Sequence, residues 1–253
     1  MRSEIQMKLD FYYFSYQCPL NGDMLRLLEL YRDRLDIHTH DIANDFALAR
    51  EQRMFFPTLT VLDGTRRYYA PLSNTFLEHA ARGEYPAEQP YVPQLSPDVT
   101  TCRVAPLTME NLALACGCCE HATAENCAEK AAFLKSCGQE IYGFVHLDER
   151  GGLLGGAEYL PSLRVPYDIP RDEKTAFLTC IYLSNAAHDY KTAPLRALEN
   201  HLHGKYERLL AVSDERGVFP NGDLDFFLRN GYRDMGVIFA DDYCTLHLVG
   251  KGL

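Results

Sequence analysis

Residues 177–202 read FLTCIYLSNAAHDYKTAPLRALENHL, and this stretch decides the fold of the second half of the chain. It begins within an apolar segment at 176–183, of the kind found in strands that are buried on both faces. A polar turn follows, and leucines at 195, 198 and 202 then recur at helical spacing. A second apolar segment at 208–212 and a helix ending at Asn230-Gly231 come next. The pattern predicts strand, turn, helix, strand and helix in that order.

Composition limits the classes of protein to consider. The 253 residues include 25 Lys and Arg against 35 Asp and Glu, a formal net charge of −10. No apolar run reaches the roughly 18 residues of a membrane-spanning helix, and the first residues, MRSEIQMK, lack the apolar core of a signal peptide. We therefore expect a cytoplasmic protein with no membrane partner. No basic face is evident that would neutralise phosphates, so we expect no nucleic-acid partner.

A proline-rich segment divides the chain. Residues 83–97, GEYPAEQPYVPQLSP, hold four prolines and few aliphatic side chains. Proline removes backbone donors and stiffens the chain, which is typical of an extended linker. The sequence predicts an α/β protein with one domain at 1–83, a linker at 84–98 and a second domain at 99–253.

The first domain alternates strands and helices. The predicted order is a strand at 9–16, a helix at 24–31, a strand at 35–42, a helix from an Asn44 cap to 53, a strand pair at 55–62 and 66–69 around an Asp-Gly turn, and a helix from a Ser73 cap to 82. Cys18-Pro19 follows the first strand, and Phe56-Pro57-Thr58 lies at the start of the third. Over residues 7–83 this arrangement resembles a thioredoxin-type fold.

The thioredoxin resemblance implies a thiol site. It places Cys18 at the entrance of a helix, where the helix dipole favours a thiolate, with Pro57 as a cis-proline opposite it. Asn21 stands where the family carries its resolving cysteine, so this motif cannot run a dithiol–disulfide cycle. Two interpretations remain open: single-thiol chemistry at Cys18, or a structural module.

In the second domain the sequence predicts a strand at 101–107, helices at 108–115 and 124–137, and a hairpin of strands at 140–147 and 153–160. The strands and helices predicted from residue 176 onward follow, and a strand pair closes the domain. The motifs Glu158-Tyr159-Leu160-Pro161 and FFLRNGY at 226–232 accompany this order. Over residues 99–250 it resembles a GNAT-family N-acetyltransferase. It is similar to a bacterial GNAT subfamily that carries a thioredoxin-like module and a cysteine-rich segment.

The GNAT resemblance implies acetyl-CoA as cofactor. Its pyrophosphate would bind backbone N–H groups of the turn at 187–194, and its pantetheine arm would lie along the strand at 180–183. The turn lacks the glycines that let a backbone approach phosphates closely, and Asp189 adds a negative charge. The implied cofactor-binding residues are Ile181, Tyr182, Leu183, His188, Tyr190, Lys191, Thr192, Ala193, Phe227 and Asn230.

The implied reaction is transfer of an acetyl group to the amine of a small molecule or peptide that the sequence does not identify. Phe227 stands where many GNAT enzymes have a proton-donating tyrosine, so Tyr232, Cys180 and Tyr182 are the candidates for the acid. Glu158 is the candidate base; water is an alternative base, and Glu158 could instead be a solvated strand residue. Positioning supplies most of the rate in such a reaction, so loss of one acid need not abolish it.

Five of the nine cysteines, Cys116, Cys118, Cys119, Cys127 and Cys137, lie within 22 positions. Cys118 and Cys119 are candidates for soft-metal binding or for redox exchange with Cys18, and the alternative is that several of the five are buried small apolar residues on helix faces. A structural zinc site would need a second ligand pair that is not evident, so no metal site is predicted. Two other functions stay open: a thiol-dependent redox or thiol-transfer protein, and an inactive GNAT-like sensor of a metal or small ligand.

Overall fold

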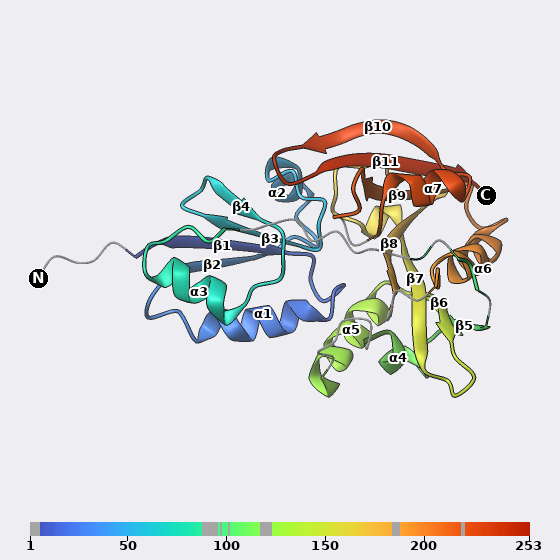
Figure 1. Cartoon of the computed structure of the whole chain (residues 1–253), viewed down its shortest axis with the longest axis horizontal. Helices are drawn as coiled ribbons and strands as arrows, with labels where there is room; N and C mark the ends of the chain where they lie inside the picture. Colours follow the sequence, from blue (N-terminus) through green and yellow to red (C-terminus); the bar gives the residue numbers. More distant parts are fainter. Residues whose placement is uncertain are drawn as a thin grey trace, which may run out of the picture.

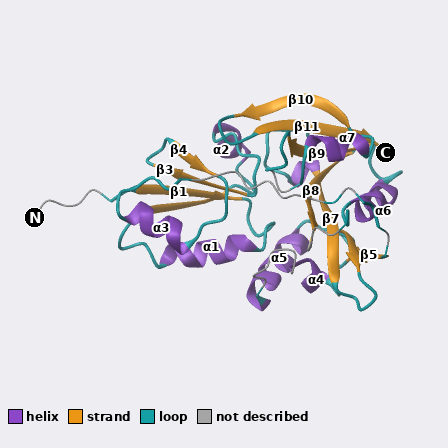
Figure 2. Ribbon diagram, viewed as in Figure 1, coloured by secondary structure: helices purple, strands orange, loops and turns teal. Residues whose placement is uncertain are grey.

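The computed structural model describes residues 6–87, 96, 98–100, 102–116, 123–183, 188–218 and 221–253. Figures 1 and 2 show two α/β units next to each other, one around a four-stranded sheet and one around a seven-stranded sheet. The elements of the first unit are β1 (Lys8–Tyr13), α1 (Leu20–Glu29), β2 (Asp36–Asp41), α2 (Phe46–Glu51), β3 (Thr58–Leu62), β4 (Arg66–Tyr68) and α3 (Asn74–Ala81). Those of the second are β5 (Arg103–Leu107), α4 (Leu112–Cys116), α5 (Ala124–Ser136), β6 (Gly143–Leu147), β7 (Leu153–Pro161), the 3₁₀ turn Ser162–Arg164, β8 (Thr175–Leu183), α6 (Thr192–Leu202), β9 (Arg208–Asp214), α7 (Leu224–Arg229), β10 (Arg233–Ala240) and β11 (Thr245–Gly252).

The four-stranded sheet has the order β2-β1-β3-β4. Strand β1 is parallel to β2 and antiparallel to β3. All five residues of β3 are buried, in keeping with its apolar sequence. Asp63 and Gly64 have φ angles of 46° and 70° and form the predicted turn between β3 and β4. Glycine adopts this left-handed backbone without a steric cost, which is why Asp-Gly favours such turns.

Helix starts follow capping chemistry more closely than apolar spacing. The predicted start of the first helix at 24 is wrong, because α1 begins directly after Pro19, a residue with pre-set helical φ. Asp45, not Asn44, caps α2 by accepting from the Leu48 N–H at 2.9 Å. The predicted Ser73 cap of α3 is confirmed, since its hydroxyl accepts from the Phe76 N–H at 3.2 Å.

The seven-stranded sheet has the order β10-β11-β9-β8-β7-β6-β5. Its described neighbours pair antiparallel, except β8 and β9, which are parallel. That parallel ladder is short: Thr175, Ala176 and Phe177 pair with residues 208–210. Strand β8 continues to Leu183 and β9 to Asp214, so the ends of the two strands lie beyond their shared ladder. Helix α6 packs on β5, β6 and β7.

One apolar cluster crosses between the two units. Tyr167, in the segment after β7, has its ring centroid 5.8 Å from that of Phe14 and 6.3 Å from that of Phe55. Phe177 of β8 lies 5.9 Å from the same Tyr167 ring. These four residues belong to a single buried cluster, so the two sheets share a core.

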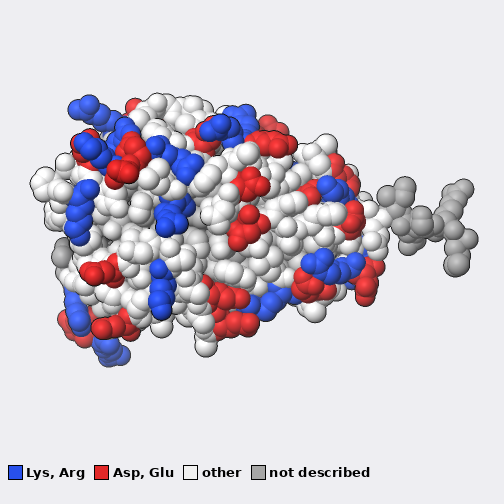
Figure 3. Space-filling model, turned by 180° about the vertical axis from the view of Figure 1, so that it is seen from behind, with Lys and Arg blue, Asp and Glu red and all other residues white. Residues whose placement is uncertain are grey.

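Charge is distributed without a one-signed face in the view of Figure 3, where Lys and Arg lie among Asp and Glu. Ion pairs such as Arg34–Glu78, at 2.7 Å, join exposed side chains of opposite sign. None of the helices in the described part of the chain combines the length and apolar character that crossing a bilayer requires.

Candidate functional site

The gap between β8 and β9 is bridged by one buried amide. Beyond Phe177, the Ile181 N–H of β8 donates to Asn221 Oδ1 at 3.1 Å. Asn221 Nδ2 donates in turn to the Val212 carbonyl of β9 at 3.2 Å. Asn221 is fully buried, so it satisfies backbone groups that the parting strands leave unpaired. The sequence analysis missed Asn221, and its backbone contact on Ile181 is one that a ligand along β8 would compete for.

The tyrosine of β8 lies across a glycine of β7. Gly156 pairs with Tyr182, and a Cβ at position 156 would come within 2.4 Å of the Tyr182 hydroxyl. Glycine is therefore needed for Tyr182 to take this position. Ile181 is fully buried. The side chain of Leu183 lies outside what the structure describes.

Glu158 is held in a buried ion pair. Its two carboxylate oxygens lie 2.9 and 2.8 Å from Nζ of Lys130 on α5, and each side chain is only 2% exposed. Cys180 pairs with Glu158 in the register of β7 and β8, where the ladder carries a bulge. A general base must reach the proton that it abstracts, and here both carboxylate oxygens of Glu158 contact Lys130 instead. The catalytic roles of Glu158 and Cys180 stay predictions.

Two cysteines lie beside this ion pair. Burial raises the pKa of the Cys116 thiol, and a hydrogen bond with Cys127 adds to the rise. A thiol with a raised pKa is a poor nucleophile near neutral pH. Cys118 and Cys119 lie outside the described residues, so their predicted redox role stays a prediction. Among the residues that are described, no three His, Cys, Asp or Glu side chains are arranged to hold a metal ion.

Tyr232 lies in a different part of the second unit. Its ring is edge-on to Phe227, with centroids 5.1 Å apart, and both belong to the core cluster under α6 and α7. Burial raises the pKa of Tyr232 well above its usual range, and the neighbouring Glu199 raises it further. Asn230 Nδ2 donates to the Phe226 carbonyl at 2.9 Å and so closes α7. Tyr232 and Phe227 are core residues in this structure, and their predicted roles in the site stay predictions.

The turn before α6 is closed by its own aspartate. Asp189 Oδ1 accepts from the N–H groups of Lys191 and Thr192 at 2.9 and 3.0 Å. Asp189 Oδ2 accepts from the Thr192 hydroxyl at 2.6 Å. The Asp189 N–H donates to the carbonyl of Asp98 at 2.9 Å. These are donors that the sequence analysis assigned to a pyrophosphate.

Lys191 points its ammonium group at α7. Its Nζ lies 4.2 Å from the centroid of the Phe226 ring, and a Cβ at Gly222 would come within 2.6 Å of it. Lys191 is 5% exposed, and burial lowers its pKa, while the charges of Asp189 and Asp223 oppose that shift. The ammonium is therefore packed between α6 and α7.

A buried histidine fixes the same turn to the sheet. His146 of β6 accepts the Cys102 N–H at Nε2, 2.8 Å away. Its proton therefore resides on Nδ1, which donates to the Tyr190 carbonyl at 3.2 Å. His188 is exposed and Ala193 half-buried. His146 was missed by the sequence analysis.

The described part of this turn does not fit the diphosphate of coenzyme A. A diphosphate at a helix start needs backbone N–H groups aimed at it. At the start of α6, the Thr192 N–H goes to Asp189, and Pro194 has no N–H. The carboxylate of Asp189 would also repel a second anion.

In the first unit, Cys18 is half-buried just before α1. Asn21 is fully buried, and its Nδ2 donates to the Ser15 carbonyl at 2.6 Å, so it is a structural residue. The predicted cis-proline is wrong, because no peptide bond among the described residues is cis. The Pro57 carbonyl accepts from the Phe14 N–H at 3.0 Å and so continues the ladder between β1 and β3. That ladder keeps the chain extended into β3.

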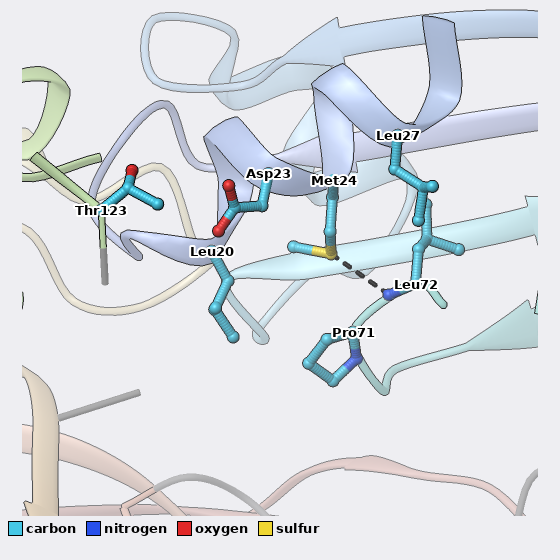
Figure 4. Close-up of a pocket in the computed structure, with 7 residues that line it drawn as sticks. All are labelled: Leu20, Asp23, Met24, Leu27, Pro71, Leu72 and Thr123. Carbon is cyan, nitrogen blue, oxygen red and sulfur yellow. Dashed lines mark hydrogen bonds between the residues drawn. The ribbon is translucent and has the colours of Figure 1, made fainter. Parts of the chain in front are cut away.

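A groove of about 580 Å³ lies along α1. Figure 4 shows Met24 of α1 facing Leu72, whose N–H points at the Met24 sulfur 3.3 Å away. Thr123, the cap residue of α5, contributes to the lining from the second unit. The lining is mostly aliphatic, with Asp23 as its single charged member.

No protein-family model and no curated protein sequence matches the chain. Among solved structures, the chain is similar to a ribosomal-protein-alanine N-acetyltransferase from Brucella melitensis, 16% identical over 60% of this chain and 100% of that one, with a TM-score of 0.44. It is also similar to an aminoglycoside 6′-acetyltransferase type Ii, 13% identical over 60% and 97% of the two chains, with a TM-score of 0.43. For an N-acetyltransferase from Staphylococcus aureus the identity is 16% over 59% and 97%, with a TM-score of 0.42.

Proposed function

We propose that residues 99–253 are a GNAT-type N-acyltransferase that moves an acyl group from a thioester to the amine of a small molecule or peptide. The observation that carries this proposal is the parting of β8 and β9 after three residue pairs. Beyond these pairs, the Ile181 N–H of β8 is bound by the Asn221 side chain and not by β9. An extended acyl donor with its own amide groups can pair with such a strand edge.

The residues around this edge suit a reaction driven by positioning. Backbone N–H groups on a rigid central strand can hold a thioester carbonyl and polarise it when the amine attacks. Asn221 would exchange its contact with Ile181 for one with the donor. Glu158 is paired with Lys130, so we expect the amine to lose its proton to water.

We extend the proposal to the first unit, as a thioredoxin-like module at 1–83 joined to 99–253 through 84–98. Support comes from the sheet order, from the parallel pairing of β1 and β2, and from Cys18-Pro19 at the start of α1. Asn21 is buried at the position of a second cysteine, which favours a structural role over a redox role.

A second candidate is a binding protein with this architecture and no catalysis. The occupied turn at Asp189 favours it, because an intact diphosphate site would be expected in a coenzyme A enzyme. Both candidate functions use a ligand site along β8, but only the acyltransferase would turn the ligand over.

The test is acyl transfer from acetyl-CoA and from acetyl-pantetheine to a panel of amines, followed by release of free thiol. Cys180→Phe enlarges a half-buried side chain of β8, and Leu30→Phe adds the same ring at an exposed position after α1 in the first unit. We expect the wild type and Leu30→Phe to transfer and Cys180→Phe to lose at least tenfold in rate. Equal rates in all three would remove β8 as the donor site, while donor binding without thiol release would favour the binding protein.

A further inference from the structure

The turn before α6 contains its own anion. The carboxylate of Asp189 receives three hydrogen bonds, from two backbone N–H groups and one hydroxyl, all within 3.0 Å. Carboxylate and phosphate oxygens use the same donors at a helix start. Asp189 therefore holds the position that a donor's diphosphate would need.

The surroundings keep Asp189 in place from two sides. Val99 forms a parallel bridge with Asp189, and the Asp98 carbonyl accepts its N–H. On the other side, the Tyr190 carbonyl is bound by the buried His146. The backbone before and after Asp189 is thus tied to two separate segments, and the carboxylate itself is held by its three hydrogen bonds, all of which a diphosphate would have to replace.

The ammonium group of Lys191 does not offset the charge of Asp189 for a ligand. Lys191 Nζ lies over the Phe226 ring, and the charges of both Asp189 and Asp223 attract it. A diphosphate arriving here would face two carboxylates and one ammonium that is packed elsewhere. The negative charge at this turn and the hydrogen bonds already made by Asp189 therefore both disfavour binding of a diphosphate.

We infer that this chain recognises its acyl donor by the pantetheine thioester alone and excludes the nucleotide diphosphate through Asp189. The inference rests on the proposed function for the identity of the donor, but the exclusion of diphosphate does not. The substrate class is an acyl thioester of pantetheine that is bound without contribution from an ADP group.

The experiment measures binding of acetyl-CoA, acetyl-pantetheine and inorganic pyrophosphate by calorimetry. Wild type is expected to bind acetyl-CoA no more than threefold more tightly than acetyl-pantetheine and to show no pyrophosphate binding. Asp189→Gly frees the N–H groups, so acetyl-CoA should bind at least tenfold more tightly and pyrophosphate should bind measurably, with acetyl-pantetheine unchanged within twofold. Asp45→Gly removes the equivalent cap of α2, far from this turn, and should alter none of the three.

Asp189→Asn keeps a capping side chain and removes the charge. It therefore shows whether a change in affinity comes from the lost charge repulsion or from damage to the fold. It should fold with a melting temperature near wild type and gain less pyrophosphate affinity than Asp189→Gly. A wild type that prefers acetyl-CoA over acetyl-pantetheine by tenfold or more overturns the inference, as does a folded Asp189→Gly with unchanged affinities. If wild type binds neither thioester while Asp189→Gly binds pyrophosphate, the exclusion stands and the proposed acyltransferase function fails.

Discussion

At the residue scale, a buried ion pair joins Lys130 to Glu158. Both side chains are 2% exposed, and the ammonium lies within 2.9 Å of both carboxylate oxygens. Removing two charges from water is costly, and their mutual attraction offsets that cost only while both partners are present. The pair therefore ties α5 to β7 at the point where β7 meets β8.

We predict that Lys130→Met lowers the free energy of unfolding by about 3–5 kcal/mol, because it leaves Glu158 buried without a counter-charge. The double variant Lys130→Met with Glu158→Leu should recover most of that loss, since no charge remains to be buried. Urea unfolding of the three proteins gives the comparison. A double variant as unstable as the single one would show that packing of the lysine stem, and not its charge, is responsible.

A second residue-scale prediction concerns His247. Its Nδ1 lies 3.0 Å from both oxygens of Asp234, and its Nε2 lies 3.3 Å from Glu215. Burial lowers the pKa of His247, but the hydrogen bonds to Asp234 and Glu215 outweigh it and leave the pKa above 6.5. Protonated His247 therefore stabilises the fold fully below pH 6.5, and this stabilisation is lost as pH rises through the folded-state pKa.

We expect His247→Gln to be less stable than wild type at pH 5.5, with the difference shrinking as the pH is raised to 8.5. Unfolding across that range measures the stability, and NMR titration of the ring measures the pKa. A folded-state pKa at or below 6.5 would contradict the prediction.

At the element scale, β8 and β9 share only three residue pairs and depend on Asn221 beyond them. We predict that Asn221→Ala costs about 1–3 kcal/mol of stability, because buried backbone groups of Ile181 and Val212 lose their partner. The Ile181 amide should also exchange its hydrogen faster. Asn111→Ala, which removes a side chain that accepts the Thr108 N–H outside this region, is the control and should leave that exchange rate unchanged. An unaltered Ile181 rate in Asn221→Ala would mean that the strands are held in another way.

Elements defined by local pattern were predictable from the sequence. The strand at 176–183 and the leucine-spaced helix after it are observed as β8 and α6, within a few residues at their ends. Asp189 had a local signal too: Asp is a preferred cap, and it bonds the N–H three residues later. From the sequence, Asp189 was interpreted by its charge and not by its capping preference.

The long-range polar contacts around the candidate site had no local sequence signal. Lys130 meets Glu158 across 28 residues, and His146 meets Tyr190 across 44. Periodicity reports which face of an element is buried, but not which polar group on another element will lie opposite. Such pairs depend on the register of strands and the docking of helices, which the full fold determines.

At the scale of the whole molecule, the two units are joined mainly by apolar packing. Polar contacts also cross the boundary, such as the Tyr69 hydroxyl donating to Asp241 at 2.5 Å and Arg50 pairing with Asp168. Exposed ion pairs contribute little, typically below about 1 kcal/mol each. Phe14, which is 1% exposed, packs edge-on against Phe133 of α5 at 5.5 Å as well as against Tyr167.

We therefore predict that Phe14→Ala uncouples the units. Scanning calorimetry of the wild type should show one transition, because the units share a core. Phe14→Ala should cost about 3–5 kcal/mol and split the melt into two transitions, since its loss opens a cavity at the boundary. Leu28→Ala, in the separate cluster of the first unit, should lower the melting temperature and keep one transition. A single transition in Phe14→Ala would mean that the remaining contacts, Phe55 with Tyr167 among them, suffice to couple the two sheets.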